Sequence, residues 1–222
     1  MDPIPIVVVG ASGHGRVIVD ILEKQGGWRL IGFLDSFLGV GHQLSGYEVI
    51  GTEMTLPHLR SLHPSLRCLV AIGDNATRRL VVDRIRTFEL PGIFATAVHP
   101  AACIGRDVAL GEGTVVMAGA IVNPNTHIGE HCIVNTNASI DHDNVWGDFS
   151  SAGPGATTGG NVQVGEGAVI AQRASVLPGR TVGRAAVVGA ASTVIHAIPA
   201  YVVAYGTPAR VVRTRSDHDK YL

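Results

Sequence analysis

The sequence predicts two domains of different fold. An α/β domain with a small, parallel, Rossmann-like sheet is expected over residues 1–97, and an all-β parallel β-helix with a C-terminal tail over residues 98–222. Strand-like and helix-like segments alternate in the first part, whereas apolar residues recur at every sixth position from Ile104 onward. The composition agrees, because 28 glycines with 5% aromatic and 16% charged residues are typical of short, regular turns.

The first part of the chain begins with a continuous β-branched run, Ile4–Val9, which predicts a strand buried on both faces. The glycine-rich turn Gly10–Gly15 follows this strand and leads into a helical pattern over Arg16–Gln25. The second strand is expected at Arg29–Leu34. After a loop, the pattern predicts a helix at Leu56–Leu62, a strand at Cys68–Ile72 and a helix at Ala76–Phe88. This alternation predicts a parallel sheet of about three to five strands.

Sixteen consecutive hexads run from Ile104 to Pro199 without a break in register. Thirteen of their first residues are Val, Ile or Leu, and the exceptions are Trp146, Ala152 and Thr158. We expect the first residue to point inward and the small fifth residue to fit near a corner. Glycine, frequent at the second position, is expected to accept the φ values that a corner needs. Three hexads make one coil, so the tract holds about five coils.

The charge balance and the cysteines exclude several classes of protein. A net charge of -1 offers no electrostatic footprint for nucleic acid or an anionic membrane. Cys68, Cys103 and Cys132 are too few and too scattered for a disulfide framework or a zinc site. The N-terminal residues lack a basic leader region, and no apolar run has the length of a membrane span, so we expect a cytoplasmic protein.

The hexad tract resembles the hexapeptide-repeat acyltransferase superfamily. With the Gly10–Gly15 turn, the Ala-Ile-Gly-Asp-Asn segment at Ala71–Asn75 and the Asp-His-Asp sequence at 141–143, the chain is similar to one branch of it, to about Arg213. That branch contains the sialic-acid O-acetyltransferases and the N-acetyltransferases of nucleotide-linked amino sugars such as bacillosamine and perosamine. The resemblance implies a left-handed coil and acetyl-CoA as cosubstrate. We also expect a homotrimer, because threefold packing would supply the second wall of an active-site groove.

A histidine in the seventh hexad is the candidate catalytic residue. An amine that attacks a thioester must lose a proton, and a neutral imidazole is well matched to accept it near pH 7. His142 stands between Asp141 and Asp143, and either carboxylate could fix the imidazole tautomer. The resemblance implies that His142 is the general base and that Asp143 is its partner.

Two other functions of a β-helix stay open at this point. The γ-type carbonic anhydrases hold zinc with histidines on such a helix, and His127, His131 and His142 occupy hexad positions six, four and three. These positions leave different parts of their coils, so a zinc site would need residues that meet across a subunit boundary, and we expect no metal. A non-catalytic role as a rigid spacer is the other alternative.

A tract of small residues, Ala152–Gly160, suits the long pantetheine arm of acetyl-CoA, although small residues also serve tight coiling. The resemblance implies CoA contacts at Ser151, Gly160, Gln172 and Ala190. The segment Tyr205–Arg210 resembles the closing G-x-P-A-[KR] motif of the family, which lies near the adenine and 3′-phosphate of CoA. Arg210 is therefore expected to bind phosphate, with Arg213 as a second candidate, unless both are simply solvated.

The Gly10–Gly15 turn joins a strand to a helix, where backbone amides can bind phosphate. Its spacing is G-x-x-G-x-G, which differs from the dinucleotide motif G-x-G-x-x-G, and NAD binding remains an alternative. Asp35 ends the second strand, where a Rossmann unit places its ribose-binding carboxylate. The resemblance implies a nucleotide-linked substrate in this domain, with contacts at Ser12, Gly13, His14, Asp35, Ser36 and Gly73.

Taken together, these patterns predict an acetyl-CoA-dependent N-acetyltransferase that acts on the 4-amino group of a nucleotide-linked amino-deoxysugar. O-acetylation of sialic acid or of another sugar hydroxyl is the alternative.

Overall fold

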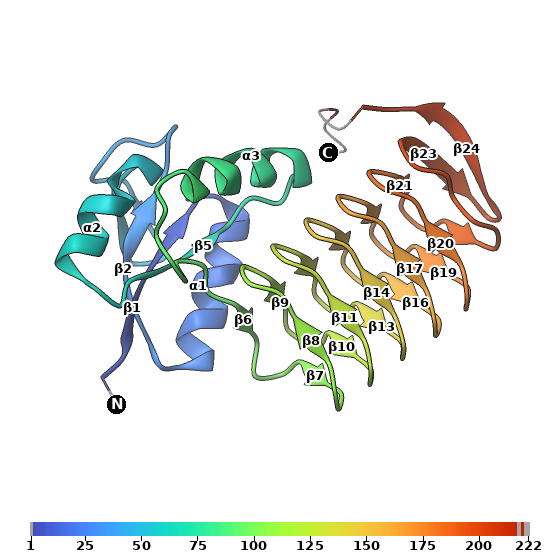
Figure 1. Ribbon diagram of the computed structural model, residues 1–222, viewed down its shortest axis with the longest axis horizontal. Helices are drawn as coiled ribbons and strands as arrows, with labels where there is room; N and C mark the ends of the chain where they lie inside the picture. Colours follow the sequence, from blue (N-terminus) through green and yellow to red (C-terminus); the bar gives the residue numbers. More distant parts are fainter. Residues whose placement is uncertain (1, 217–218, 220–222) are drawn as a thin grey trace. The chain divides into compact units, whose positions relative to one another are not determined.

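The computed structural model describes residues 2–216 and 219. The chain divides between Pro100 and Ala101 into two compact units, whose elements are labelled in Figure 1. The first unit alternates strands with helices, and the second is built from short parallel strands. The predicted fold class, an α/β unit followed by a left-handed parallel β-helix, is confirmed.

Five strands form the sheet of the first unit, in the order β3-β4-β2-β1-β5. They are β1 (Ile4–Val9), β2 (Trp28–Leu34), β3 (Gln43–Leu44), β4 (Tyr47–Gly51) and β5 (Arg67–Val70). All except β3 run parallel, and β3 pairs antiparallel with β4 at one edge. Residues 5–9 of β1 are buried, as expected for a β-branched run that lies between two neighbouring strands.

The connections of the first unit contain α1 (Gly13–Gln25), the 3-10 turn η1 (Glu53–Thr55), α2 (Leu56–Leu62) and α3 (Asn75–Arg86), and the short strand β6 (Ala97–Val98) ends it. All three predicted helices are present. Helix α1 begins three residues before the expected Arg16, because Gly13 to Gly15 form its first turn. Among the residues that the structure describes, no helix is both long enough and apolar enough to cross a membrane.

The hairpin of β3 and β4 differs from the sequence prediction, which expects only a loop between Asp35 and α2. Ser45 and Gly46 form its two-residue turn, and their φ angles are 51° and 82°. Positive φ at both central residues is the backbone of the tight turn that suits twisted strands. The sequence did not indicate this hairpin, because the first of these positions is a serine, whereas Asn-Gly or Asp-Gly is the usual signal of such a turn.

Sixteen two-residue strands form the three faces of the β-helix in the described part of the second unit. The first face holds β7 (Cys103–Ile104), β10 (Ile121–Val122), β13 (Ser139–Ile140), β16 (Thr157–Thr158), β19 (Ser175–Val176) and β22 (Thr193–Val194). The second face holds β8 (Ala109–Leu110), β11 (His127–Ile128), β14 (Val145–Trp146), β17 (Gln163–Val164) and β20 (Thr181–Val182). The third face holds β9 (Val115–Val116), β12 (Ile133–Val134), β15 (Ser151–Ala152), β18 (Val169–Ile170) and β21 (Val187–Val188).

Each strand pairs in parallel with the strand eighteen residues away, so that Ile121 lies between Cys103 and Ser139. This spacing agrees with three hexads in each coil. We call the turns that lead from the first face to the second the His142 corner (residues 141–144 and their counterparts eighteen residues away). The turns that lead from the third face to the first are the Gln172 corner (residues 171–174 and their counterparts).

The interior of the β-helix is filled by the first residues of the hexads. Val122, Val134 and Ile170 are fully buried there, and Trp146, an exception to the aliphatic pattern, occupies the same buried position. After the last coil, β23 (Val202–Gly206) pairs with β21, and the chain then folds back as β24 (Ala209–Thr214), antiparallel to β23.

The glycines at the second hexad position have a role that differs from the expected one. Positive φ falls instead on the fourth residue of a hexad, as at Asp143 and Asn161, both with φ of 57°. A Cβ atom at Gly165 would lie 2.4 Å from the backbone nitrogen of Arg184 in the next coil. The second position therefore excludes a side chain because consecutive coils approach each other closely there. The prediction that glycine is needed at this position for its φ angle is wrong.

The inward register predicts opposite effects for two neighbouring substitutions in β17. Val164 is 3% exposed, whereas the side chain of Gln163 faces solvent. Val164→Asp should prevent folding, because it buries an unpaired carboxylate among apolar side chains. Gln163→Asp, the matched control, should fold and melt like the wild type. Thermal unfolding followed by circular dichroism checks both, and a cooperative melt of soluble Val164→Asp would contradict the register.

Candidate active site

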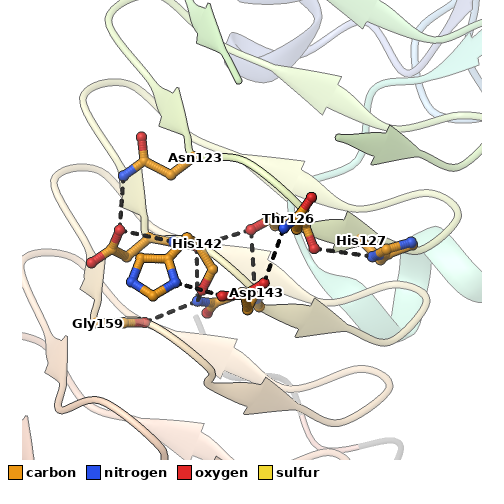
Figure 2. A network of polar contacts seen from close by, with 9 residues as sticks. Asn123, Thr126, His127, His142, Asp143 and Gly159 are labelled. Carbon is orange, nitrogen blue, oxygen red and sulfur yellow. Dashed lines mark hydrogen bonds and ion pairs between the residues drawn. The ribbon is translucent and has the colours of Figure 1, made fainter. Parts of the chain in front are cut away.

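The candidate catalytic pair lies in the turn that follows β13. Nδ1 of His142 is 2.6 Å from Oδ2 of Asp143, and Figure 2 shows the two side chains facing each other. Both side chains are at least half exposed, so the imidazole is open to a substrate. When the Nδ1–H donates to the carboxylate, the other ring nitrogen, Nε2, keeps its lone pair free to accept a proton.

Buried polar side chains hold this turn from the inside. Nδ2 of Asn144 donates to the carbonyl oxygens of Asp141 at 2.9 Å, His142 at 3.1 Å and Gly159 at 2.9 Å. Oγ1 of Thr126, one coil earlier, donates to the same Asp141 carbonyl at 2.9 Å, and Figure 2 shows how these contacts surround the turn. The backbone that carries the imidazole is thus fixed while its ring stays exposed. Asn144 was not among the residues predicted from the sequence, although an amide among the small fifth residues of the hexads was a signal.

The two flanking carboxylates have different partners. Oδ1 of Asp141 accepts hydrogen bonds from the backbone N–H of His142 at 2.8 Å and from Nδ2 of Asn123 at 2.9 Å. Asp143 contacts the ring itself, and its other oxygen lies 3.3 Å from Nδ2 of Asn125. The hydrogen bond to Asp143, and next the charge of Asp141, raise the pKa of His142. The ring contact also holds the pKa of Asp143 below its usual value.

Gly160 lies next to the imidazole, at the equivalent position in the next coil. A Cβ atom at residue 160 would lie 2.6 Å from Cε1 and 2.7 Å from Nε2 of His142. The ring therefore occupies space that any other residue would fill. Of the residues predicted to bind CoA, Gly160 is the one that the chain brings to His142 in this way.

The other residues predicted to bind CoA lie elsewhere on the chain. Gln172 and Ala190 are exposed in consecutive coils of the Gln172 corner, and Ser151 is buried on the third face. Arg210 is exposed on β24, where its guanidinium donates to the carbonyl of Ala209 at 3.1 Å. Within one chain, the first face separates the Gln172 corner from the His142 corner. The second phosphate candidate, Arg213, lies 3.6 Å from a carboxylate oxygen of Asp219.

In the first unit, the glycine-rich turn is tightly packed on one side and open on the other. A Cβ atom at Gly15 would lie 2.5 Å from the carbonyl oxygen of Gly10, and Gly10 itself has φ of 108°. At Gly13, by contrast, a Cβ atom would have no neighbour within 4 Å. Ser12 and Gly13 are both exposed. Ser12 and Gly13 thus border open space, whereas His14 is partly buried.

The carboxylate of Asp35 is largely engaged by backbone. Its Oδ2 accepts the N–H of Ala11 at 2.7 Å, and its Oδ1 accepts those of Phe37 at 2.8 Å and Leu38 at 2.9 Å. Burial would raise the pKa of Asp35, but these three hydrogen bonds outweigh it and hold the pKa below its usual value. Next to it, the hydroxyl of Ser36 donates to Oε2 of Glu53 at 2.7 Å. Both residues therefore brace this loop, and their predicted contacts with substrate remain predictions.

A buried arginine that was not among the predicted site residues binds Gly73 and acts electrostatically on His14. Arg78 of α3 is 1% exposed and donates to the carbonyl oxygens of Ile72 at 2.8 Å and Gly73 at 3.0 Å. Burial, and next the charge of Arg78, lower the pKa of His14 to about 4. His14 is thus neutral near pH 7. In the sequence, Arg78 resembles any solvated residue of a helix, so no signal distinguished it.

The three histidines considered for zinc have separate surroundings in one chain. His131 stacks on Phe149 with ring centroids 5.3 Å apart, and Nδ1 of His127 lies 3.2 Å from the carbonyl oxygen of Asn125. Across residues 2–216 and 219, no three His, Cys, Asp or Glu side chains are grouped as a metal site.

Three comparisons relate the chain to known proteins. The PglD N-terminal domain family matches residues 5–85. GDP-perosamine N-acetyltransferase from Escherichia coli O157:H7 is 29% identical over 219 residues, which are 93% of this chain and 95% of that protein. PerB from Caulobacter crescentus, solved with CoA and GDP-perosamine, is 35% identical with a TM-score of 0.86 over 94% of this chain and 97% of its own. The acetyltransferase domain of PglB from Neisseria gonorrhoeae FA1090, solved with acetyl coenzyme A, is 31% identical with a TM-score of 0.87 over 95% and 100%.

The contact between His142 and Asp143 predicts a change that nuclear magnetic resonance can measure. Asp143→Asn should lower the pKa of His142, because it removes the carboxylate that stabilises the imidazolium. Asp141→Asn is the matched control and should lower the pKa less, since Asp141 acts on the ring only through its charge. Titration of the histidine ring signals checks both variants. An unchanged pKa in Asp143→Asn would show that the pair does not form in solution.

Proposed function

Since the chain belongs to the hexapeptide-repeat acyltransferase superfamily, in the branch of the perosamine and bacillosamine N-acetyltransferases, we propose that it acetylates the 4-amino group of a nucleotide-linked amino-deoxysugar. The chain is an acetyl-CoA-dependent sugar N-acetyltransferase. The observation that carries the finer proposal is the exposed His142–Asp143 pair, whose ring lies beside the bare backbone of Gly160.

In this proposal, His142 is the general base. The amine nitrogen forms a bond to the thioester carbonyl carbon, the carbon–sulfur bond breaks, and Nε2 of His142 takes the proton that the nitrogen loses. The carboxylate of Asp143 stabilises the imidazolium that results, and the proton then passes to the departing thiolate. The raised pKa of His142 strengthens it as a base for this step.

The first unit is proposed to hold the nucleotide of the substrate. The exposed residues Ser12 and Gly13 border open space at the carboxyl end of β1, which is where open α/β sheets bind ligands. Asp35 ties this turn to the loop after β2 through the N–H of Ala11. The substrate contacts predicted at His14, Ser36 and Gly73 belong to the same proposal.

We also propose that the active enzyme is a homotrimer in which two neighbouring copies share each site. Gly160 adjoins His142, whereas Gln172 and Ala190 lie on another corner of the same chain. A second copy that presents its Gln172 corner to the His142 corner of the first would bring the two sets of residues together. Ser151 and Arg210 are proposed to contact CoA in the same assembly.

Turnover of the His142→Ala variant tests the catalytic proposal. We expect kcat to fall by roughly 10²- to 10⁴-fold, the usual effect of losing a general base, while CoA affinity stays close to that of the wild type. Asp143→Asn should lose less, because it leaves the imidazole in place. The measurement is release of free CoA with GDP-, UDP- and dTDP-linked 4-amino sugars, with sialic acid, and without acceptor.

Near wild-type turnover of His142→Ala would remove this residue from the mechanism. Release of CoA with sialic acid, and with none of the amino sugars, would replace N-acetylation by O-acetylation. Release with no acceptor in the panel would contradict the proposed substrate class.

Mixing two inactive variants tests whether copies share the site. His142→Ala lacks the base, and Ala190→Trp should block the CoA groove, so each alone should be inactive. If one copy supplies His142 and its neighbour supplies Ala190, about one quarter of the sites in randomly mixed trimers should be intact. Coexpression followed by a CoA-release assay and light scattering measures this. No recovery of activity, or an active monomer, would contradict the shared site.

A further inference from the structure

We propose that Phe37 is a stacking platform for the nucleobase of the substrate, an inference that rests on the proposed function. Its side chain is 96% exposed, the highest value among the large apolar side chains of the described residues. A phenylalanine ring gains much from burial, so a ring held almost wholly in water has both faces available to a flat partner.

The position of Phe37 in the fold indicates which part of a ligand it would meet. Strand β2 ends at Leu34, beside the end of β1, from which the glycine-rich turn departs. In a Rossmann arrangement, phosphate binds at that turn, the ribose lies near the residue that ends the second strand, and the base lies beyond it. Asp35 directly follows the last residue of β2, and its contact with the N–H of Ala11 ties the loop to the turn. Phe37 comes two residues further along the chain, in the loop after β2, which is where this arrangement leads from the ribose towards the base.

The backbone around Phe37 is held on both sides, although its ring is free. Oδ1 of Asp35 accepts the N–H groups of Phe37 and Leu38. The hydroxyl of Ser36 donates to Glu53, which is buried and paired with Arg84. An aromatic side chain on a fixed backbone loses little conformational entropy when a ligand covers it, so this arrangement favours binding.

A nucleobase is the partner that this arrangement fits best. Every base offers a flat π face, and stacking on an aromatic side chain depends little on which base is present. The platform would therefore contribute affinity for any nucleoside diphosphate.

Isothermal titration of the full chain with GDP, UDP and dTDP tests the platform. Against the nucleotide that the wild type binds most tightly, Phe37→Ala should weaken affinity by about 5- to 150-fold, the range for losing one aromatic–base stack. Phe37→Trp should retain affinity. Phe37→Leu should lose most of it, because leucine keeps the apolar volume without the flat face.

Leu62→Ala is the matched control, since Leu62 is also a highly exposed apolar residue, 59% exposed. Leu62 is the last residue of α2, the helix that leads to the start of β5. Strand β5 lies at the edge of the sheet opposite β3, the strand that follows the Phe37 loop, so affinity should not change. Equal affinity of the wild type and Phe37→Ala would overturn the platform alone and leave the nucleotide-linked substrate in place. A wild type that binds none of the three nucleotides would overturn both, and an equal loss in Leu62→Ala would overturn the specific role of Phe37.

Discussion

The close stacking of each coil on the one before it is the constraint on which the second unit depends. Backbone hydrogen bonds connect the two-residue strands of the coils with their counterparts eighteen residues away, and glycines at the second hexad position let neighbouring corners approach within contact distance. Such a ladder has little freedom of its own, so the position of an outward side chain follows from its place in the register. The imidazole of His142 gains its space in this way, because the residue one coil further on, Gly160, has no side chain.

The surroundings of two histidines shift their pKa values in opposite directions. His142 is exposed, and a hydrogen-bonded carboxylate raises its pKa, which favours proton acceptance. His14 is partly buried near the cation Arg78, and its pKa falls to about 4. Burial and a neighbouring positive charge both disfavour the imidazolium, whereas a carboxylate favours it. Of these two histidines, His142 is the one whose surroundings stabilise the charged product of proton transfer, which is what a general base requires.

The sequence predicts those features that depend on residues close together in the chain. The six-residue period identifies the coils, and adjacency brings Asp143 into consideration as the partner of His142. Adjacency alone does not separate Asp143 from Asp141, because the choice depends on the turn: Asp143 has φ of 57° and meets the ring, while Asp141 meets backbone. Asn144 was missed for a similar reason, since one of its acceptors, the carbonyl oxygen of Gly159, lies fifteen residues further along the chain.

Asp35 stands where a Rossmann unit places its ribose-binding carboxylate, but its oxygens are largely bound by backbone N–H groups. A carboxylate offers about four acceptor sites, and backbone N–H groups occupy three of them here. A ribose hydroxyl would therefore find little capacity left on this residue, even though it directly follows the second strand, where the Rossmann pattern places a ribose-binding carboxylate. The carboxylate instead joins the glycine-rich turn to the loop after β2, so that it orders both segments at once. In the proposed nucleotide site, affinity would then come mainly from groups around Asp35, which include the open backbone at Gly13 and the exposed ring of Phe37.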